Sequence, residues 1–406
     1  MSETIRREGN RIALPGFASA HSHAFQRAMR GRTQRSAKAG SFWSWRELMY
    51  DLVARLDPES LYAISRFAFA ELAMSGVTAV GEFHYLHHAP RGSPYADRIV
   101  LADAVIRAAR DVGLRICLLR VVYERDGFGR PAQGAQARFV DGDVELGIRD
   151  LEEIERRFAT DRCVRVGLAP HSVRAVSADT IAQVARYANG RGLPLHMHVS
   201  EQERDVEECV AEHDARPVEV LAKHGALSER FVAVHAIHIN EHEARELGTQ
   251  KAFVCVCRTT EGDLGDGSPP VSILVQAGVR FCTGVDSHAL TDPFEEARAI
   301  ELDERTRTGK RPAAMDADML LQAGSEHGYV ALGFGETPSS DRVIVDLTDP
   351  ALVGAPSLSD AVIFGASPRA VRDVIVNGNT IVQEGRHVRY DEIRIAYEKT
   401  LEAFGR

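Results

Sequence analysis

The chain has 406 residues, of which 44% are hydrophobic and 26% charged, as in an ordinary globular protein. Its net charge of −9 excludes a general nucleic-acid-binding protein, which needs basic patches to displace counterions. No apolar run reaches the roughly 18 residues of a membrane span, and the N-terminus lacks the apolar segment of a signal peptide. The six cysteines form no C-x-x-C pair, so we expect a reduced, cytoplasmic protein without membrane or nucleic-acid partners.

Strand-like apolar runs alternate with helical patterns between residues 12 and 310. The expected strands cover residues 12–20, 77–83, 115–123, 164–170, 193–199, 231–237, 252–257 and 279–286. Helical periodicity predicts helices that include 58–76, 97–113 and 144–159. Asp57 before Pro58 is typical of a helix start, and Gly76 and Gly113 stand where helices end.

Strands that are apolar throughout and alternate with helices predict a parallel sheet buried on both faces. Eight such units fit an α/β fold of the (β/α)8 TIM-barrel type, with an open doubly wound sheet as the alternative. No G-x-G-x-x-G follows the first strand and no P-loop occurs, so the nucleotide-binding alternatives lose their main support. We therefore predict a barrel over residues 12–335.

The pattern changes after residue 340. The segments 341–347, 360–366 and 371–388 are expected to be short strands with an Asn-Gly turn at 377–378, followed by a closing helix. We predict a small β-domain formed by residues 336–406 and the N-terminal segment 1–11. Because little sequence precedes the first barrel strand, this domain is expected to be reduced on its N-terminal side.

Polar residues with metal-binding and acid–base chemistry stand at the carboxyl ends of the predicted strands, where TIM barrels place their chemistry. In chain order these are His21 and His23, Tyr85, His171 and Arg174, His196, His198 and Glu201, His235, and Asp286. His21 and His23 are two residues apart, so both side chains are expected on one face of a strand. Three imidazoles and one carboxylate suit a divalent ion and leave a position for water. The pKa of such a water falls to about 7, and a nearby carboxylate and histidine can then move protons.

Six motifs in combination resemble the amidohydrolase superfamily, and within it the formimidoylglutamate deiminases of histidine degradation: HSHAFQRAM, EFHYLHH, PHSVRAVS, HMHVSEQ, TTEGDLGDG and GVDSH. The resemblance covers about residues 12–310. It implies a homodimeric enzyme with one divalent metal ion, Zn²⁺ in the first place and Fe²⁺ or Mn²⁺ as alternatives. The implied reaction converts N-formimino-L-glutamate and water to N-formyl-L-glutamate and ammonia.

The resemblance also assigns roles to residues of this chain. The implied metal ligands are His21, His23, His198 and Asp286. The implied proton-handling residues are Glu201, His235 and Asp286. The residues that would hold the substrate are Gln26, Arg46, Tyr85, His171 and Arg174.

The residue types agree with these implications. Binuclear members of the superfamily bridge two metals with a lysine after strand 4, but here that strand ends in APHS, which favours one metal. Arg46, in a segment expected to be a loop (42–50), and Arg174 favour a small acidic substrate, because a guanidinium binds carboxylates bidentately. We expect Glu201 to protonate the imino nitrogen and the departing ammonia, while His235 and Asp286 stabilise and deprotonate the attacking water.

Three alternatives stay open at this point. One is a shorter formimino amino acid such as N-formimino-L-aspartate, because one methylene alters only the length of the pocket. Another is a deaminase or hydrolase acting on a purine, pterin or triazine, which would need flat apolar walls. The last is a non-catalytic barrel, which would lack a ligand or the acid.

Further histidines and cysteines are expected to be structural. The histidines of 84–88 are interpreted as packing and surface residues, and Cys255 and Cys257 as core residues on one strand face. Arg258 follows Cys257 where the family usually has proline, so the loop after strand 7 is expected to differ.

Overall fold

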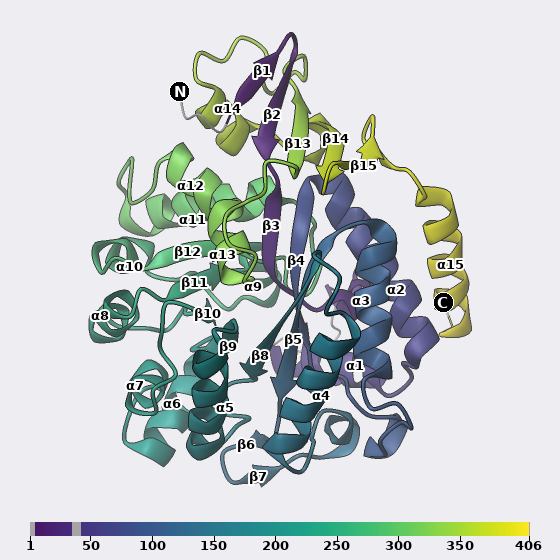
Figure 1. Ribbon diagram of the computed structural model, residues 1–406. Helices are drawn as coiled ribbons and strands as arrows, with labels where there is room; N and C mark the ends of the chain where they lie inside the picture. The colour runs from purple at the N-terminus through teal and green to yellow at the C-terminus, as the bar shows by residue number, and fades with distance from the viewer. Residues whose placement is uncertain (1–4, 35–41, 406) are drawn as a thin grey trace.

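Eight parallel strands close into a barrel in the computed structural model, which describes residues 5–34 and 42–405 (Figure 1). In chain order they are β3 (Phe17–Ser22), β4 (Val77–His84), β5 (Arg115–Val122), β8 (Val164–Pro170), β9 (Leu195–Val199), β10 (Phe231–His235), β11 (Phe253–Val256) and β12 (Arg280–Thr283). The predicted TIM barrel is confirmed, and an open sheet is excluded because β12 pairs with β3.

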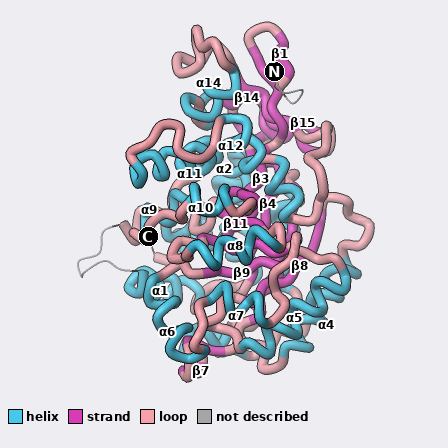
Figure 2. The backbone as a smooth tube through the Cα atoms, turned by 90° about the vertical axis from the view of Figure 1, so that its left-hand side faces the viewer, coloured by secondary structure: helices cyan, strands magenta, loops and turns pink. Residues whose placement is uncertain are grey.

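Helices surround the barrel (Figure 2). They are α2 (Pro58–Ser75), α3 (Val100–Val112), α4 (Val144–Arg157), α5 (Ala178–Arg191), α6 (Glu203–His213), α7 (Pro217–Lys223), α8 (Glu241–Thr249), α9 (Arg258–Leu264), α10 (Val271–Gln276), α11 (Pro293–Thr308), α12 (Ala317–Gly324) and α13 (Glu326–Ala331). The Asp57 side chain accepts a hydrogen bond from the Ser60 N–H at the start of α2, and Gly76 and Gly113 end α2 and α3 in the left-handed conformation. The predicted helix boundaries at these residues are confirmed.

A second sheet stands at one end of the molecule and joins the two ends of the chain (Figures 1 and 2). Its strands in spatial order are β1 (Arg6–Glu8), β2 (Arg11–Pro15), β13 (Arg342–Asp346), β14 (Val371–Val376), β15 (Asn379–Gln383) and β16 (Arg386–His387). The expected turn at Asn377 and Gly378 has φ of 51° and 78°, and helix α15 (Tyr390–Ala403) follows and packs on α2.

The strand expected over 12–20 is in fact two strands that belong to different sheets. Residues up to Pro15 pair with β13, and the barrel strand begins at Phe17. The boundary placed before residue 12 therefore lies at Gly16. A Cβ atom there would lie 2.1 Å from Thr78 Oγ1, so only glycine lets the chain pass β4 where it crosses between the sheets.

The segment 360–366, expected to be a strand, lies in helix α14 (Leu358–Gly365). The Ser357 side chain accepts a hydrogen bond from the Asp360 N–H and so caps this helix. A short apolar run does not distinguish a strand from a buried helical segment, and here the capping residue decides.

Two insertions follow barrel strands at their carboxyl ends. After β3 come the 3-10 helix η1 (Ala24–Met29) and helix α1 (Phe42–Val53), and after β5 come the hairpin β6 (Arg125–Gly127)–β7 (Arg130–Pro131) and η3 (Gly134–Arg138). Both views place the β6–β7 hairpin at the end of the molecule opposite the small sheet (Figures 1 and 2).

The first and last barrel strands meet over a short length. Their only register pair is Thr283 with Ser19, extended by a bridge between Ser22 and Asp286. At this joint a Cβ atom on Gly284 would lie 2.8 Å from His21 Cβ and 2.9 Å from Cys257 Sγ, so glycine is required.

The cysteines and the helix hydropathy can be compared with the expectations from the sequence. All six cysteines are free and buried. Among the described helices none combines the length and the hydropathy needed to cross a bilayer.

Candidate active site

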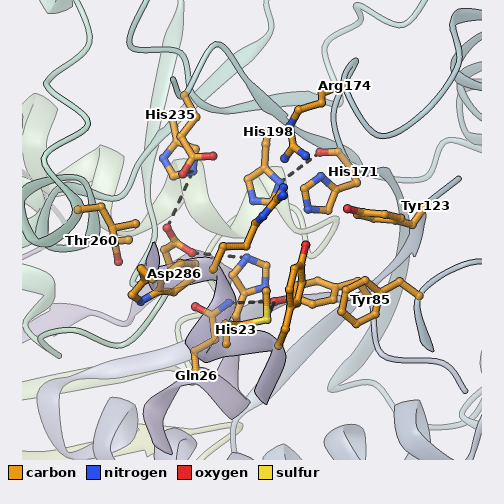
Figure 3. Close-up of a pocket in the computed structure, with 17 residues that line it drawn as sticks. His23, Gln26, Tyr85, Tyr123, His171, Arg174, His198, His235, Thr260 and Asp286 are labelled. Atoms are coloured by element: carbon orange, nitrogen blue, oxygen red, sulfur yellow. Dashed lines mark hydrogen bonds and ion pairs between the residues drawn. The ribbon is translucent and has the colours of Figure 1, made fainter. Parts of the chain in front are cut away.

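A cleft of about 590 Å³, its opening to solvent included, lies at the carboxyl ends of the barrel strands. Nearly every predicted site residue lines it: His23, Gln26, Arg46, Tyr85, His171, Arg174, His198, Glu201, His235 and Asp286 (Figure 3). His21 is fully buried directly beside this set. The structure thus brings all the predicted site residues together, and their individual roles stay predictions.

Three imidazoles converge on a single point, and the Asp286 carboxylate lies beside two of them. His21 Nε2 lies 3.2 Å from His198 Nε2 and 3.6 Å from Asp286 Oδ1, and His23 Nε2 lies 3.5 Å from the same oxygen. The ligand atoms of the three histidines all lie within 4.8 Å of one another. Atoms bound at about 2.0–2.2 Å to one ion have such separations.

The hydrogen bonds of these rings turn their lone pairs toward that point. His23 Nδ1 lies 3.0 Å from the Phe83 carbonyl and His198 Nδ1 lies 3.2 Å from the His171 carbonyl, so each Nδ1 carries the proton. Burial lowers the pKa of His23 to about 3 and also lowers the pKa of His21 and His198. Neutral rings with facing lone pairs repel each other unless a cation lies between them, so these residues fit a divalent metal ion.

Strand β4 holds the His-Ser-His turn in place. Glu82 accepts hydrogen bonds from the Ser22 hydroxyl at 2.7 Å and from the Ala24 N–H at 2.8 Å. Because β3 ends at Ser22, His21 lies in the strand and His23 lies just beyond it. Glu82, which the sequence analysis missed, therefore holds the backbone of the turn that carries both rings.

The two histidines of β9 have different surroundings. His198 faces His21, whereas His196 Nε2 lies 3.0 Å from the Ala331 carbonyl of α13 and does not line the cleft. The geometry therefore favours His198 as the ligand, as predicted.

Glu201 and Asp286 flank His235 at the entrance to the histidine cluster. His235 Nε2 lies 3.7 Å from Glu201 Oε1 and 3.9 Å from Asp286 Oδ2. Burial raises the pKa of Glu201 to about 8, so this carboxyl keeps its proton near neutral pH and suits a proton donor. Burial alone would lower the pKa of His235, but the carboxyls of Glu201, Glu261 and Asp286 raise it and so make this ring more basic.

The two predicted arginines lie across the cleft, and each is held by a carboxylate. Arg46 Nη2 lies 3.0 Å from Asp126 Oδ1, and Arg174 Nε lies 3.0 Å from Asp205 Oδ1. Arg174 also donates a hydrogen bond to the Asp126 carbonyl at 2.8 Å. Arg46 lies in helix α1 and not in the expected loop.

Gln26, Tyr85 and His171 line the cleft beside the histidine cluster (Figure 3): the ring centroids of Tyr85 and His23 lie 5.1 Å apart, and those of His171 and His198 lie 4.7 Å apart. The Gln26 amide donates to the Tyr85 hydroxyl at 2.9 Å, and His171 stacks edge-on against Tyr123 with ring centroids 4.9 Å apart. These side chains are therefore fixed in orientation before any ligand enters.

The sequence analysis missed several polar residues at the arginine side. Gln136 Nε2 lies 3.0 Å from the hydroxyls of both Tyr50 and Tyr123 and 2.7 Å from Asp126 Oδ1. No local motif marks these residues, because each belongs to an insertion and acquires its partners only through the fold. Thr260 also lines the cleft. It belongs to the TTEGDLGDG motif, and the sequence analysis assigned no role to any residue of that motif.

The remaining clusters have structural surroundings. His87 and His88 are buried and lie 3.0 and 2.9 Å from backbone carbonyls, as a packing role requires. Cys257 is a fully buried core residue whose thiol also lies near His235 and Asp286. Arg258 forms an ion pair with Asp303 of α11 and does not line the cleft.

Comparisons with known proteins agree with this architecture. The Amidohydrolase family matches residues 12–381. The formimidoylglutamate deiminase of Pseudomonas aeruginosa is 36% identical over 96% of this chain and 88% of its own length. A crystal structure of an amidohydrolase from Brucella melitensis has a TM-score of 0.89 at 32% identity and covers 98% of this chain and 95% of its own. An adenosine deaminase from Xanthomonas campestris with bound zinc shares the fold, with a TM-score of 0.81 at 21% identity over 96% of this chain and 85% of its own.

Fold and site together define a barrel hydrolase whose chemistry takes place at the strand ends. The chain belongs to the amidohydrolase family. It is an amidohydrolase-type deaminase, a hydrolase that acts on C–N bonds, which overturns the non-catalytic alternative.

Proposed function

We propose that this enzyme hydrolyses N-formimino-L-glutamate to N-formyl-L-glutamate and ammonia with one divalent metal ion, Zn²⁺ in the first place. The observation that carries this proposal is the single cleft that joins a cluster of three imidazoles and a carboxylate to two arginines. The 36% identity to a formimidoylglutamate deiminase supports it.

His21, His23, His198 and Asp286 are the residues that would hold the ion. A bound divalent ion would lower the pKa of a coordinated water to about 7 and so supply hydroxide at neutral pH. Oδ1 of Asp286 faces His21 and His23, whereas Oδ2 faces His235. This carboxylate is therefore able to serve both the metal and the proton acceptor.

The addition of water to the formimino carbon requires one proton to leave the water and one to reach the imino nitrogen. His235 Nε2, with Asp286 beside it, accepts the first proton, and the protonated Glu201 donates the second. The tetrahedral adduct then breaks its C–N bond. The proton of its hydroxyl reaches the departing nitrogen through the same groups, so that N-formyl-L-glutamate and ammonia are formed.

The arginine side of the cleft recognises the two carboxylates in this proposal. A guanidinium has five N–H donors, so a guanidinium that is held by one aspartate can still present others to a ligand. The pairs Arg46–Asp126 and Arg174–Asp205 fix these donors before substrate arrives, which reduces the entropy lost on binding. Gln26, Tyr85 and His171 are proposed to line the path of the formimino group.

Two other substrates are distinguished by experiment. N-Formimino-L-aspartate carries the same groups on a shorter chain, and one methylene changes specificity by about 10–200-fold. A purine is disfavoured because Arg46 and Arg174 line the cleft. The likeness to the zinc-containing adenosine deaminase, at 21% identity, supports the fold and not a shared substrate.

The test is ammonia release by metal-analysed protein from N-formimino-L-glutamate, N-formimino-L-aspartate, adenosine and guanine. We expect about one zinc per chain and a kcat/KM at least about tenfold higher for N-formimino-L-glutamate than for the others. Preference for a purine, or for the aspartate derivative, would overturn the assignment. The cytoplasmic location and the homodimer stay predictions.

A further inference from the structure

A buried acid, Glu261, lies behind His235 on the side away from the cleft. It belongs to the first turn of α9, within the TTEGDLGDG motif, and is fully buried. Its Oε1 lies 3.1 Å from His235 Nδ1 and accepts a hydrogen bond from the Cys257 N–H at 2.9 Å. Nothing in the sequence assignments or in the proposed mechanism uses this residue.

The backbone at His235 has an unusual conformation, and the ring of this residue is held by its hydrogen bond with Glu261. His235 and Ala236 have φ of 71° and 50°, a left-handed conformation that residues other than glycine rarely adopt. The strand therefore ends abruptly at the residue whose ring must face the cleft. Its Nδ1 is engaged by Glu261, and its Nε2 faces Glu201 and Asp286.

We propose that Glu261 is a positioning residue for His235: its Oε1 holds the ring proton on Nδ1 and thereby turns the Nε2 lone pair toward the attacking water. Histidines that work at metal sites are commonly fixed in this way by a carboxylate on the other nitrogen. The proposal rests on the proposed function only for the choice of assay substrate.

A purely structural role would be to cap α9 through the Cys257 N–H. Such a cap does not require a carboxylate at full burial, and it does not account for the second bond from the same oxygen to His235. Oε2 of Glu261 is buried without a hydrogen-bond partner among the described residues. A group left unsatisfied in this way calls for a reason beyond capping, and the hydrogen bond of the same carboxyl group with His235 supplies one.

Two substitutions separate the parts of this contact. Glu261→Met keeps the length and bulk of the side chain but removes the acceptor, so we expect kcat to fall about 10–100-fold. Glu261→Gln can keep Oε1 in place for both hydrogen bonds and removes only the charge, so kcat should fall less, about threefold to tenfold. For both variants KM should stay within about threefold of the wild-type value, and the zinc content should stay at about one per chain. The reason is that Glu261 touches neither the proposed substrate site nor the proposed ligands.

A double-mutant cycle with His235→Ala distinguishes positioning from stability. If Glu261 acts through His235, adding either Glu261 substitution to His235→Ala should change kcat by less than about threefold. A further tenfold loss in either double variant would overturn the proposal. The control is Glu304→Gln, which alters another buried acid that accepts a backbone N–H, at Ser272, far from His235. Its kcat should stay within about threefold of wild type.

The ring proton gives a readout that needs no substrate. In proton NMR spectra of ¹⁵N-histidine-labelled protein, we expect a downfield Nδ1–H signal that disappears in His235→Ala and Glu261→Met but persists in Glu261→Gln and Glu304→Gln. Persistence in Glu261→Met would overturn the proposal. If the wild type shows the Glu261-dependent signal but releases no ammonia from N-formimino-L-glutamate, the proposed function fails while this inference stands. If Glu261→Met does not fold, the Glu261→Gln arm of the kinetic cycle decides.

Discussion

The cleft is lined by two groups of residues that are built in different ways, and we refer to them as the histidine end and the arginine end. The histidine end consists of side chains at the ends of barrel strands: His21, His23, His198, His235 and Asp286. The arginine end consists of two ion pairs: Arg46–Asp126 joins the two insertions, and Arg174–Asp205 joins the loop after β8 to helix α6. Residues of the histidine end are at most 8% exposed. At the arginine end Arg46 and Asp126 keep 17% and 24% of their side chains exposed, whereas Arg174 and Asp205 keep only 4% and 12%.

This difference separates the reaction from the substrate. Strand ends are held by the barrel hydrogen bonds, so the distances that acid–base and metal chemistry need are fixed by the fold. Insertions change without disturbing the barrel, so they suit the part of the site that selects a ligand. The predictions below test whether the two ends can be altered independently.

The largest effect is expected at the histidine end. His198→Ala should lose the metal ion and reduce kcat about 10⁴-fold, because the ion no longer has a complete set of ligands. His196→Ala is the matched control on the same strand and should keep about one zinc per chain. Metal analysis and ammonia release measure both, and one tightly held zinc in His198→Ala would contradict the ligand assignment.

Removal of the proposed acid should separate metal binding from turnover. Glu201→Gln is expected to keep the metal ion and to lose about 10³-fold in kcat, the usual contribution of a general acid. Because burial raises the pKa of Glu201 to about 8, wild-type kcat should fall above that pH as the proton is lost. Full activity in Glu201→Gln would remove the assignment, and the exposed Glu203→Gln variant of the next helix controls for the substitution.

A smaller effect on binding is expected at the arginine end. Arg46→Gln should raise KM for N-formimino-L-glutamate about 10–100-fold, because a charged hydrogen bond is lost and Asp126 is left to repel the substrate. Its kcat should change by less than about threefold if the two ends are independent. Arg55→Gln, outside the cleft lining, is the control, and an equal loss in kcat would show that the ends are coupled.

The smallest effect on ligand binding is expected when the metal ion alone is removed. Chelation should abolish ammonia release, while the affinity for the product N-formyl-L-glutamate changes by less than about threefold, since its carboxylates are proposed to contact only the arginine end. Calorimetric titration of metal-free protein measures this, with one added equivalent of Zn²⁺ restoring activity. Loss of product binding on chelation would show that the histidine end also holds the carboxylates.

The same contrast explains what the sequence could predict. The histidine end could be predicted because buried parallel strands have apolar sequences, so that polar residues at the strand ends stand out. The arginine end could be predicted only in part. Arg46 was assigned through a resemblance, and its segment is a helix and not the expected loop. Its partner Asp126 lies 80 residues away in the sequence. Glu261 stood within a noted motif, but its partner is 26 residues distant, and no local pattern reveals that contact.

The fold shows the same limits. Nearly continuous apolar runs located all eight barrel strands, but the crossing at Gly16 and the helix over 358–365 depended on contacts that a short window does not contain. The close approach of Gly16 to Thr78 arises only when β2 and β4 are both in place.

The short joint between β3 and β12 has a consequence for how the protein is made. His21 and Asp286 stand on opposite sides of this joint, and the 264 residues between them must be synthesised before they can meet. A growing polypeptide on the ribosome therefore holds no complete set of the proposed ligands until its last barrel strand has emerged. An ion bound by these two residues would link the first barrel strand to the last. It would find its full set of proposed ligands only after the barrel has closed.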